Sequence, residues 1–197
     1  MSHSTWRWLA SGLLLISWIC AGGTTIATAQ AQPAVNPLAQ NLADFKERVD
    51  AYAALHRKIE DSLPKFSNES TPEEIDRHQR SFMSAIVAAR ASAKQGDIFT
   101  APARKTIRSL IAGAFARGNR ETLRESIQDE NVGAVRIRVN ARYPENVPLA
   151  NMPAELLQNL PPLPEVVEYR FVGDSLILLD PGAHLIVDYV PNALPPR

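Results

Sequence analysis

The spacing of apolar residues changes once along this chain, and that change limits the fold more than any other feature. From Leu38 to Ile127 apolar side chains recur every three or four residues, which is the period of an amphipathic helix. From Val135 onward they alternate with polar residues or form short continuous runs, as in strands. Helices followed by strands predict an α+β fold, in which an N-terminal helical hairpin and further helices pack on a small, mostly antiparallel C-terminal sheet.

Four helical segments are expected before residue 130. The first covers 38–63, and the second begins at the capping box Thr71-Pro72-Glu73-Glu74 and ends at Gly96. A short loop joins these two segments, so we expect them to pack as an antiparallel pair. A third helix is predicted over 102–117, and a short fourth one begins after Asn119.

The β-rich part, residues 131–197, begins with an alternating segment, 135–139, that predicts an amphipathic strand. A proline-rich segment, 143–164, follows and has room for one or two helical turns over 153–160. The chain should then end in a three-stranded meander. Its strands are predicted at 166–172, 176–180 and 185–189.

Two turns and one buried strand define this meander. Gly173-Asp174 suits the tight turn of a hairpin, because glycine in the first position is typical of a type II′ turn. Pro181-Gly182 favours a type II turn, which matches the twist of paired strands poorly, so we expect a longer loop there. Leu176–Leu179 is apolar on both faces and should be the most buried strand.

Residues 1–29 have the pattern of a secretory signal peptide. Arg7 gives a positive start, an apolar run extends to Ile19, and Ala27-Thr28-Ala29 supplies the small residues that a signal peptidase requires. The alternative is a membrane anchor, but the apolar run is shorter than the roughly 20 residues that span a bilayer. We therefore expect a periplasmic or secreted protein that does not span the membrane after cleavage.

The expected mature chain has a flexible lead-in, 30–37, and one α+β domain, 38–197, whose helical part is 38–130. Cys20 is the only cysteine and would leave with the signal peptide, so the mature chain forms no disulfide. The formal net charge of the whole chain is zero. That balance argues against nucleic acid as a partner. No phosphate loop, dinucleotide fingerprint or other cofactor motif is present, so no cofactor is predicted.

The tetrapeptide Gly173-Asp174-Ser175-Leu176 resembles the motif that names the GDSL esterases and lipases, in which the serine is the nucleophile. In that family the motif opens the domain and an Asp-x-x-His pair follows downstream. Here the motif lies near the end of the chain, and Asp180 and His184 are spaced one residue too far apart. A Gly-Asp pair between two apolar runs is also what a tight hairpin requires, and we favour that interpretation.

A metal site is a second hypothesis. His56 and Glu60 are four residues apart on the first predicted helix, and Glu74 and His78 are four apart on the second. An antiparallel hairpin would bring His56 level with His78 and Glu60 level with Glu74. Two imidazoles and two carboxylates suit zinc or a similar divalent ion. Boundary histidines beside capping acids explain the same residues without a ligand.

An anion site is a third hypothesis. Arg136 and Arg138 lie on the polar face of the strand predicted at 135–139, and Arg142 follows. Guanidinium groups grouped in this way bind phosphate or carboxylate. The alternative is that these arginines form the solvated face that an amphipathic strand needs.

A set of short segments spread over most of the mature chain carries a resemblance: Gly96–Thr100, Tyr143-Pro144, Pro148–Ala150, Met152-Pro153, Leu160-Pro161, Glu168–Gly173, Leu176–Leu178, Asp180 and Leu185–Asp188. In these segments the chain resembles an uncharacterised family of exported bacterial proteins. The resemblance implies export and a terminal β-hairpin, and it implies no activity. The tail alone is similar to the terminal hairpin of several small periplasmic proteins, including ones linked to nickel and cobalt homeostasis.

The sequence therefore favours an exported, non-catalytic protein that binds an envelope protein or a small ligand. A periplasmic protein that binds a divalent metal is the alternative. A serine hydrolase that uses Ser175 comes third.

Cleavage of the signal peptide gives the first testable prediction. Ala27 and Ala29 are the only suitably spaced small residues after the apolar run, so the mature chain should begin at Gln30. The intact mass of the exported product measures this directly. A product that keeps residues 1–29 in the membrane would contradict the prediction.

Overall fold

Side-chain caps determine where the helices begin. The computed structural model describes residues 36–65, 71–128, 135–144, 147 and 152–196, so the predicted signal peptide lies outside the described residues. The Asn36 side chain accepts a hydrogen bond from the Leu38 amide at the start of α1 (Pro37–Ser62), and Thr71 and Glu74 form the predicted capping box of α2 (Pro72–Ala89). Thr100 caps α3 (Ala101–Arg117). Two shorter helices follow, α4 (Arg120–Gln128) and α5 (Ala154–Leu157).

The C-terminal strands form the predicted antiparallel meander. Its strands are β1 (Glu168–Val172), β2 (Ser175–Asp180) and β3 (Leu185–Val190), in the spatial order β1-β2-β3. Val172 pairs with Ser175, so Gly173 and Asp174 alone make the turn, as predicted. The loop from β2 to β3 is longer and contains His184 in a left-handed conformation, with φ of 51°. Five helices preceding or flanking this sheet, within the described residues, confirm the α+β class.

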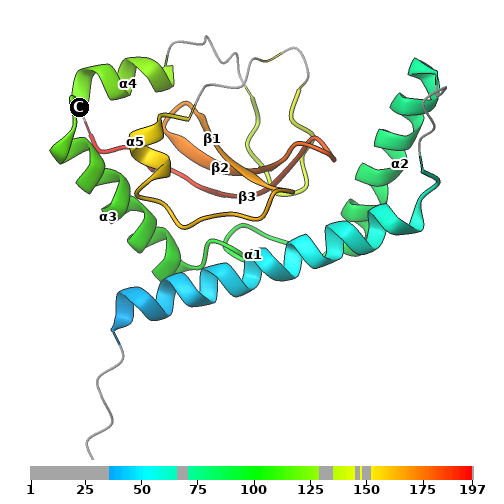
Figure 1. Ribbon diagram of the computed structural model, residues 1–197, viewed down its shortest axis with the longest axis horizontal. Coiled ribbons are helices and arrows are strands. Elements are labelled where there is room, and N and C mark those ends of the chain that lie inside the picture. The colour runs from blue at the N-terminus through cyan, green and yellow to red at the C-terminus, as the bar shows by residue number, and fades with distance from the viewer. Residues whose placement is uncertain (1–35, 66–70, 129–134, 145–146, 148–151, 197) are drawn as a thin grey trace, which may run out of the picture. The chain divides into compact units, whose positions relative to one another are not determined.

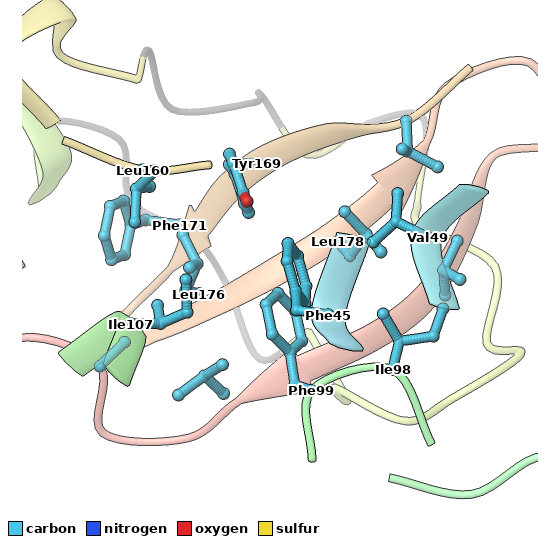
Figure 2. Packing of buried hydrophobic residues seen from close by; sticks show 14 of the residues in the cluster. Phe45, Val49, Ile98, Phe99, Ile107, Leu160, Tyr169, Phe171, Leu176 and Leu178 are labelled. Atoms are coloured by element: carbon cyan, nitrogen blue, oxygen red, sulfur yellow. The ribbon is translucent and has the colours of Figure 1, made fainter. Parts of the chain in front are cut away.

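The long helix α1 runs along one side of the sheet (Figure 1). α1 is the longest helix and runs past the sheet, with α3 at its N-terminal end and α2 folding back from its C-terminal end. Figure 2 shows the layer between α1 and the sheet, where the Phe45 and Phe99 rings stack with centroids 5.1 Å apart against Leu176 and Leu178 of β2. None of the helices in the described ranges is both long enough and apolar enough to cross a membrane.

A second, smaller apolar cluster covers the opposite face of the sheet. Ile177 and Leu179 of β2 point into it, so β2 is buried on both faces, as predicted for Leu176–Leu179. Part of its cover comes from Val135 and Ile137, which are half-buried against it. These two residues belong to the segment that the alternating pattern assigned to a strand. The structure corrects that prediction, because 135–139 forms no strand, although the apolar side chains of this segment are half-buried.

The next segment, residues 140–143, forms hydrogen bonds with β3. Asn140 donates its backbone amide to the Ile186 carbonyl, and Tyr143 donates to the His184 carbonyl. Arg142 forms an isolated bridge with Leu185. The segment 140–143 therefore lies along the outer edge of β3, which reduces the exposed edge available for aggregation.

The end of α2 also differs from the prediction. The helix ends at Ala89 and not at Gly96, which lies in the following loop with φ of 95°. At its end Arg90 donates from its side chain to the Val187 carbonyl and to the Asn140 side chain, at 2.9 and 2.8 Å. These contacts to β3 and its neighbouring segment hold the end of α2 against the sheet. They exist only in the folded protein, so the local sequence did not reveal them.

The hairpin turn gives the second prediction. Gly173 has φ of 57°, and a side chain there would meet no atom within 4 Å, so only backbone strain opposes a substitution. Gly173→Val should lower the free energy of unfolding by at least 1–2 kcal/mol, roughly the penalty of a left-handed backbone. Gly173→Asn should cost less, because asparagine tolerates that conformation. Thermal melts of both variants beside Ser175→Ala measure the effect, and equal melting temperatures for Gly173→Val and wild type would contradict it.

Candidate functional site

A buried carboxylate at the end of β2 organises the most unusual polar cluster of the protein. Asp180 follows Leu176 and Leu178 with the period of two that places them on one face, and its side chain is fully buried. Its Oδ2 accepts hydrogen bonds from the Tyr52 hydroxyl and from His56 Nδ1, both at 2.6 Å. Its Oδ1 accepts the Ala183 amide at 2.8 Å. The carboxylate therefore joins α1 to β2 and to the loop that follows β2.

The helical period explains why α1 supplies both partners. Phe45, Val49, Tyr52 and His56 follow each other at steps of four, three and four, and all are buried. They form one face of α1, and the sheet lies against this face (Figure 2). His56 lies in the apolar stripe, as the sequence indicated. Its partner Asp180 is 124 residues away, and no local pattern pointed to it.

The hydrogen bonds assign the tautomer of His56. A carboxylate only accepts, so Nδ1 carries the proton that bonds Asp180. In the neutral imidazole, Nε2 then has the lone pair. Nε2 faces the Glu60 carboxylate, with 3.6 Å between Nε2 and Oε2. That distance is too long for a hydrogen bond.

The imidazole is also held by its apolar neighbours. The Phe82 ring meets it edge-on, with centroids 4.8 Å apart and planes at 89°. On another side lies Gly182, where an added Cβ would be 3.4 Å from both the His56 ring and the Asp180 carboxylate. These are ordinary van der Waals distances, so the space beside the His56–Asp180 pair does not require glycine here. The hydrogen bond to Asp180 and the edge-on contact with Phe82 orient the ring.

A second group of charges ties α2 and the loop before α3 to the sheet. The Arg90 guanidinium lies over the Tyr52 ring, 5.0 Å from its centroid, and burial lowers the pKa of Arg90. The fully buried Asp188 carboxylate accepts the backbone amides of Ile98 and Phe99, at 2.9 and 2.8 Å, as well as that of Gly96. The hydrogen bonds of the Asp188 carboxylate therefore hold the loop 96–99 against β3.

Sequence reasoning missed four of these residues: Tyr52, Arg90, Asp180 and Asp188. A signal was available for the two aspartates, because Asp180 ends an apolar run in β2 and Asp188 interrupts one in β3. A carboxylate at such a position requires hydrogen-bond partners. The identity of those partners depends on the packing of α1 and of the loop 96–99.

The four residues of the predicted metal site do not form one group. Glu74 accepts the Thr71 amide at 2.8 Å and so completes the capping box, while His56 bonds Asp180. The expected register of the helix pair is wrong at this point: Phe82, one turn beyond His78, lies against His56. The apolar face of α2, which includes Phe82 and Ile86, packs inward and decides the register. Over the residues that the structure covers, no three His, Cys, Asp or Glu side chains gather in a way that would hold a metal ion.

The other candidate residues lie elsewhere. Arg136 and Arg138 are exposed on the segment that covers the second face of the sheet, and Arg142 is exposed in the segment along the edge of β3. An anion site formed by these residues stays a prediction. Ser175 begins β2, whereas the imidazole of His56 contacts Asp180 at its other end. Five residues of extended strand separate these ends by about 17 Å. The geometry thus gives Ser175 a place in the hairpin, and His56 is too distant to act as its base.

A shallow apolar hollow of about 270 Å³ lies beside β1. Arg170 and Glu168 also line it, and they form a two-pronged ion pair with both N–O distances at 2.8 Å. Tyr169, another lining residue, donates its hydroxyl to the Pro161 carbonyl at 3.1 Å. Its apolar lining comes mainly from Met152, Leu157, Pro161, Pro162, Leu163 and Val167.

The chain matches no protein-family model. Searches of curated proteins and of solved structures also found no match. The proposed function therefore rests on the fold and on the sites described above.

The Tyr52–Asp180 bond gives the third prediction. Burial, and next the charge of Asp180, raise the pKa of Tyr52 above its ordinary value. The unfolded tyrosine ionises near pH 10 while the folded one stays neutral, so this contribution to stability is present below about pH 10 and is lost as the pH rises further. Tyr52→Phe should make that alkaline decline shallower by up to about 1.4 kcal/mol per pH unit. Urea unfolding from pH 8 to 11 measures it, and parallel curves for both proteins would refute it.

Proposed function

We propose that the protein is an exported, non-catalytic binding protein that takes an apolar side chain of an envelope partner into the hollow beside β1. The observation that carries this proposal is the apolar hollow itself, together with the exposure of Leu157 on its wall. Leu157 is 47% exposed, although the leucines of the neighbouring strands are buried. A leucine left in water beside a concave apolar surface is typical of a recognition site.

The charged residues that line the hollow add polar selectivity. The Glu168–Arg170 pair is part-buried, and both partners satisfy each other in a fork geometry. A ligand in the hollow would meet this ion pair beside the apolar side chains. Such a combination favours an apolar side chain presented by a polar backbone, as in an extended peptide segment.

Export supports the same function. Residues 1–29 have the signal-peptide pattern, which places the expected site of action in the cell envelope. The buried contacts of Asp180 and Asp188 hold α1 and the loop 96–99 on the sheet, so the hollow belongs to a stabilised scaffold. A rigid scaffold lowers the entropic cost of binding.

A substitution on the wall of the hollow tests the proposal and gives the fourth prediction. Leu157→Glu should weaken binding of the fluorescent apolar probe 1-anilinonaphthalene-8-sulfonate about tenfold, since one buried leucine contributes on the order of 1.5 kcal/mol. Leu38→Glu is the matched control, because Leu38 is equally exposed, at 45%, but lies at the start of α1.

The same two variants test the biological partner. Immobilised wild-type protein and Leu38→Glu should retain the same proteins from envelope extract, and Leu157→Glu should lose them. Retention that is equal in all three proteins would refute the role of the hollow. Circular dichroism melts of each variant establish that the loss does not come from unfolding.

A further inference from the structure

The hollow beside β1 contains more than aliphatic side chains. Its lining includes the Met152 thioether, the Tyr169 ring and the Arg170 guanidinium. A thioether sulfur, a second ring and a guanidinium plane are all attracted to the charge distribution of an aromatic ring. An aliphatic side chain has no such charge distribution, so these three groups distinguish one class of apolar ligand from the other.

We propose that the hollow selects an aromatic side chain of its partner, and that Arg170 is the residue that sets this selectivity. The inference rests on the proposed function, because it names the class of side chain that the same hollow takes. The hollow has a volume of about 270 Å³. Pockets for drug-sized ligands have roughly 300–1,000 Å³, so this space suits one large side chain better than a whole small molecule.

The ion pair with Glu168 leaves the plane of the Arg170 guanidinium for stacking. Nε and Nη2 of Arg170 both donate to Glu168 at 2.8 Å, so the edge that carries these two nitrogens is occupied. A guanidinium that is hydrogen-bonded through its edge still stacks on a ring through its face. The Arg170 side chain is 23% exposed, which leaves part of it accessible to a ligand. Glu168 also balances its charge, so the pair gives no net preference for an acidic or a basic side chain.

Most of the remaining lining is held in place before a ligand binds. The Tyr169 hydroxyl donates to the Pro161 carbonyl at 3.1 Å, and the pyrrolidine rings of Pro161 and Pro162 fix the backbone of this wall. Met152 is the adaptable element, because an unbranched thioether adjusts its shape to the ring that enters. A wall that is already ordered loses little conformational entropy on binding.

Two ligands of nearly the same shape separate aromatic recognition from simple apolar burial and give the fifth prediction. N-acetylphenylalanine amide carries a flat aromatic ring, and N-acetylcyclohexylalanine amide carries a saturated ring of similar size. The saturated ring is the more apolar of the two, so burial alone would favour it. We expect the protein to bind the phenylalanine compound about fivefold more tightly, as one guanidinium–ring contact provides.

The NMR signal of the Met152 methyl group, in protein with isotope-labelled methionine methyls, measures this binding. Either ring changes the signal when it enters the hollow, and titration of each compound gives its dissociation constant. Met83 is the internal control, because it lies on α2, which contributes none of the described lining. Its signal should stay in place during both titrations.

Two variants test the role of Arg170. Arg170→Lys keeps a positive charge beside Glu168 but removes the guanidinium plane, so the preference for the phenylalanine compound should fall below about twofold. Arg136→Lys is the matched control and should keep the full preference, because Arg136 is exposed and does not line the hollow. A preference that survives in Arg170→Lys would overturn the role of Arg170.

The comparison of the two ligands also separates this inference from the proposed function. Equal or tighter binding of the cyclohexylalanine compound to wild type would overturn the aromatic selectivity and leave the proposed function standing. If neither compound changes the Met152 signal at concentrations on the order of tens of millimolar, the hollow takes no apolar side chain. The proposed function would then be wrong together with the inference.

Discussion

The buried carboxylate of Asp180 is the interaction on which the arrangement of the helices depends. It lies at the end of the most buried strand and accepts hydrogen bonds from Tyr52 and His56, one helical turn apart on α1. Replacing Tyr52 or His56 would leave the buried Asp180 carboxylate with one hydrogen bond fewer. Removing one partner of a buried charged pair costs about 3–5 kcal/mol. Hydrophobic burial by itself is non-directional, so it specifies the position of α1 less sharply than hydrogen bonds do. The two bonds to one carboxylate oxygen specify a single register.

Asp188 fixes a second junction in a similar way. Its carboxylate on β3 accepts hydrogen bonds from backbone amides of the loop 96–99. This loop leads directly into the N-terminal cap of α3. Arg90 links the end of α2 to the same strand through the Val187 carbonyl. The sheet thus holds three helical segments through specific polar contacts at its edges and ends. Between these contacts, the apolar layer around Phe45 and Phe99 supplies most of the burial.

The proposed binding site lies at one edge of this scaffold. The hollow beside β1 is an apolar surface whose lining includes the Glu168–Arg170 ion pair, and it suits a protein or peptide partner. The His56–Asp180 contact belongs to the core, where it holds α1 on β2.

The sequence by itself determined the features that depend on neighbouring residues. Thr71 and Glu74 cap α2 across three residues, and Gly173-Asp174 turns a hairpin between adjacent strands, so both were predictable from local stereochemistry. Tertiary structure decided the rest. The segment 135–139 alternates like a strand but forms none, and its apolar side chains cover the sheet. α2 ends at Ala89, where the Arg90 side chain bonds β3. His56 was a visible candidate, yet its partner lies 124 residues away, and only the packing of α1 on β2 brings the two together.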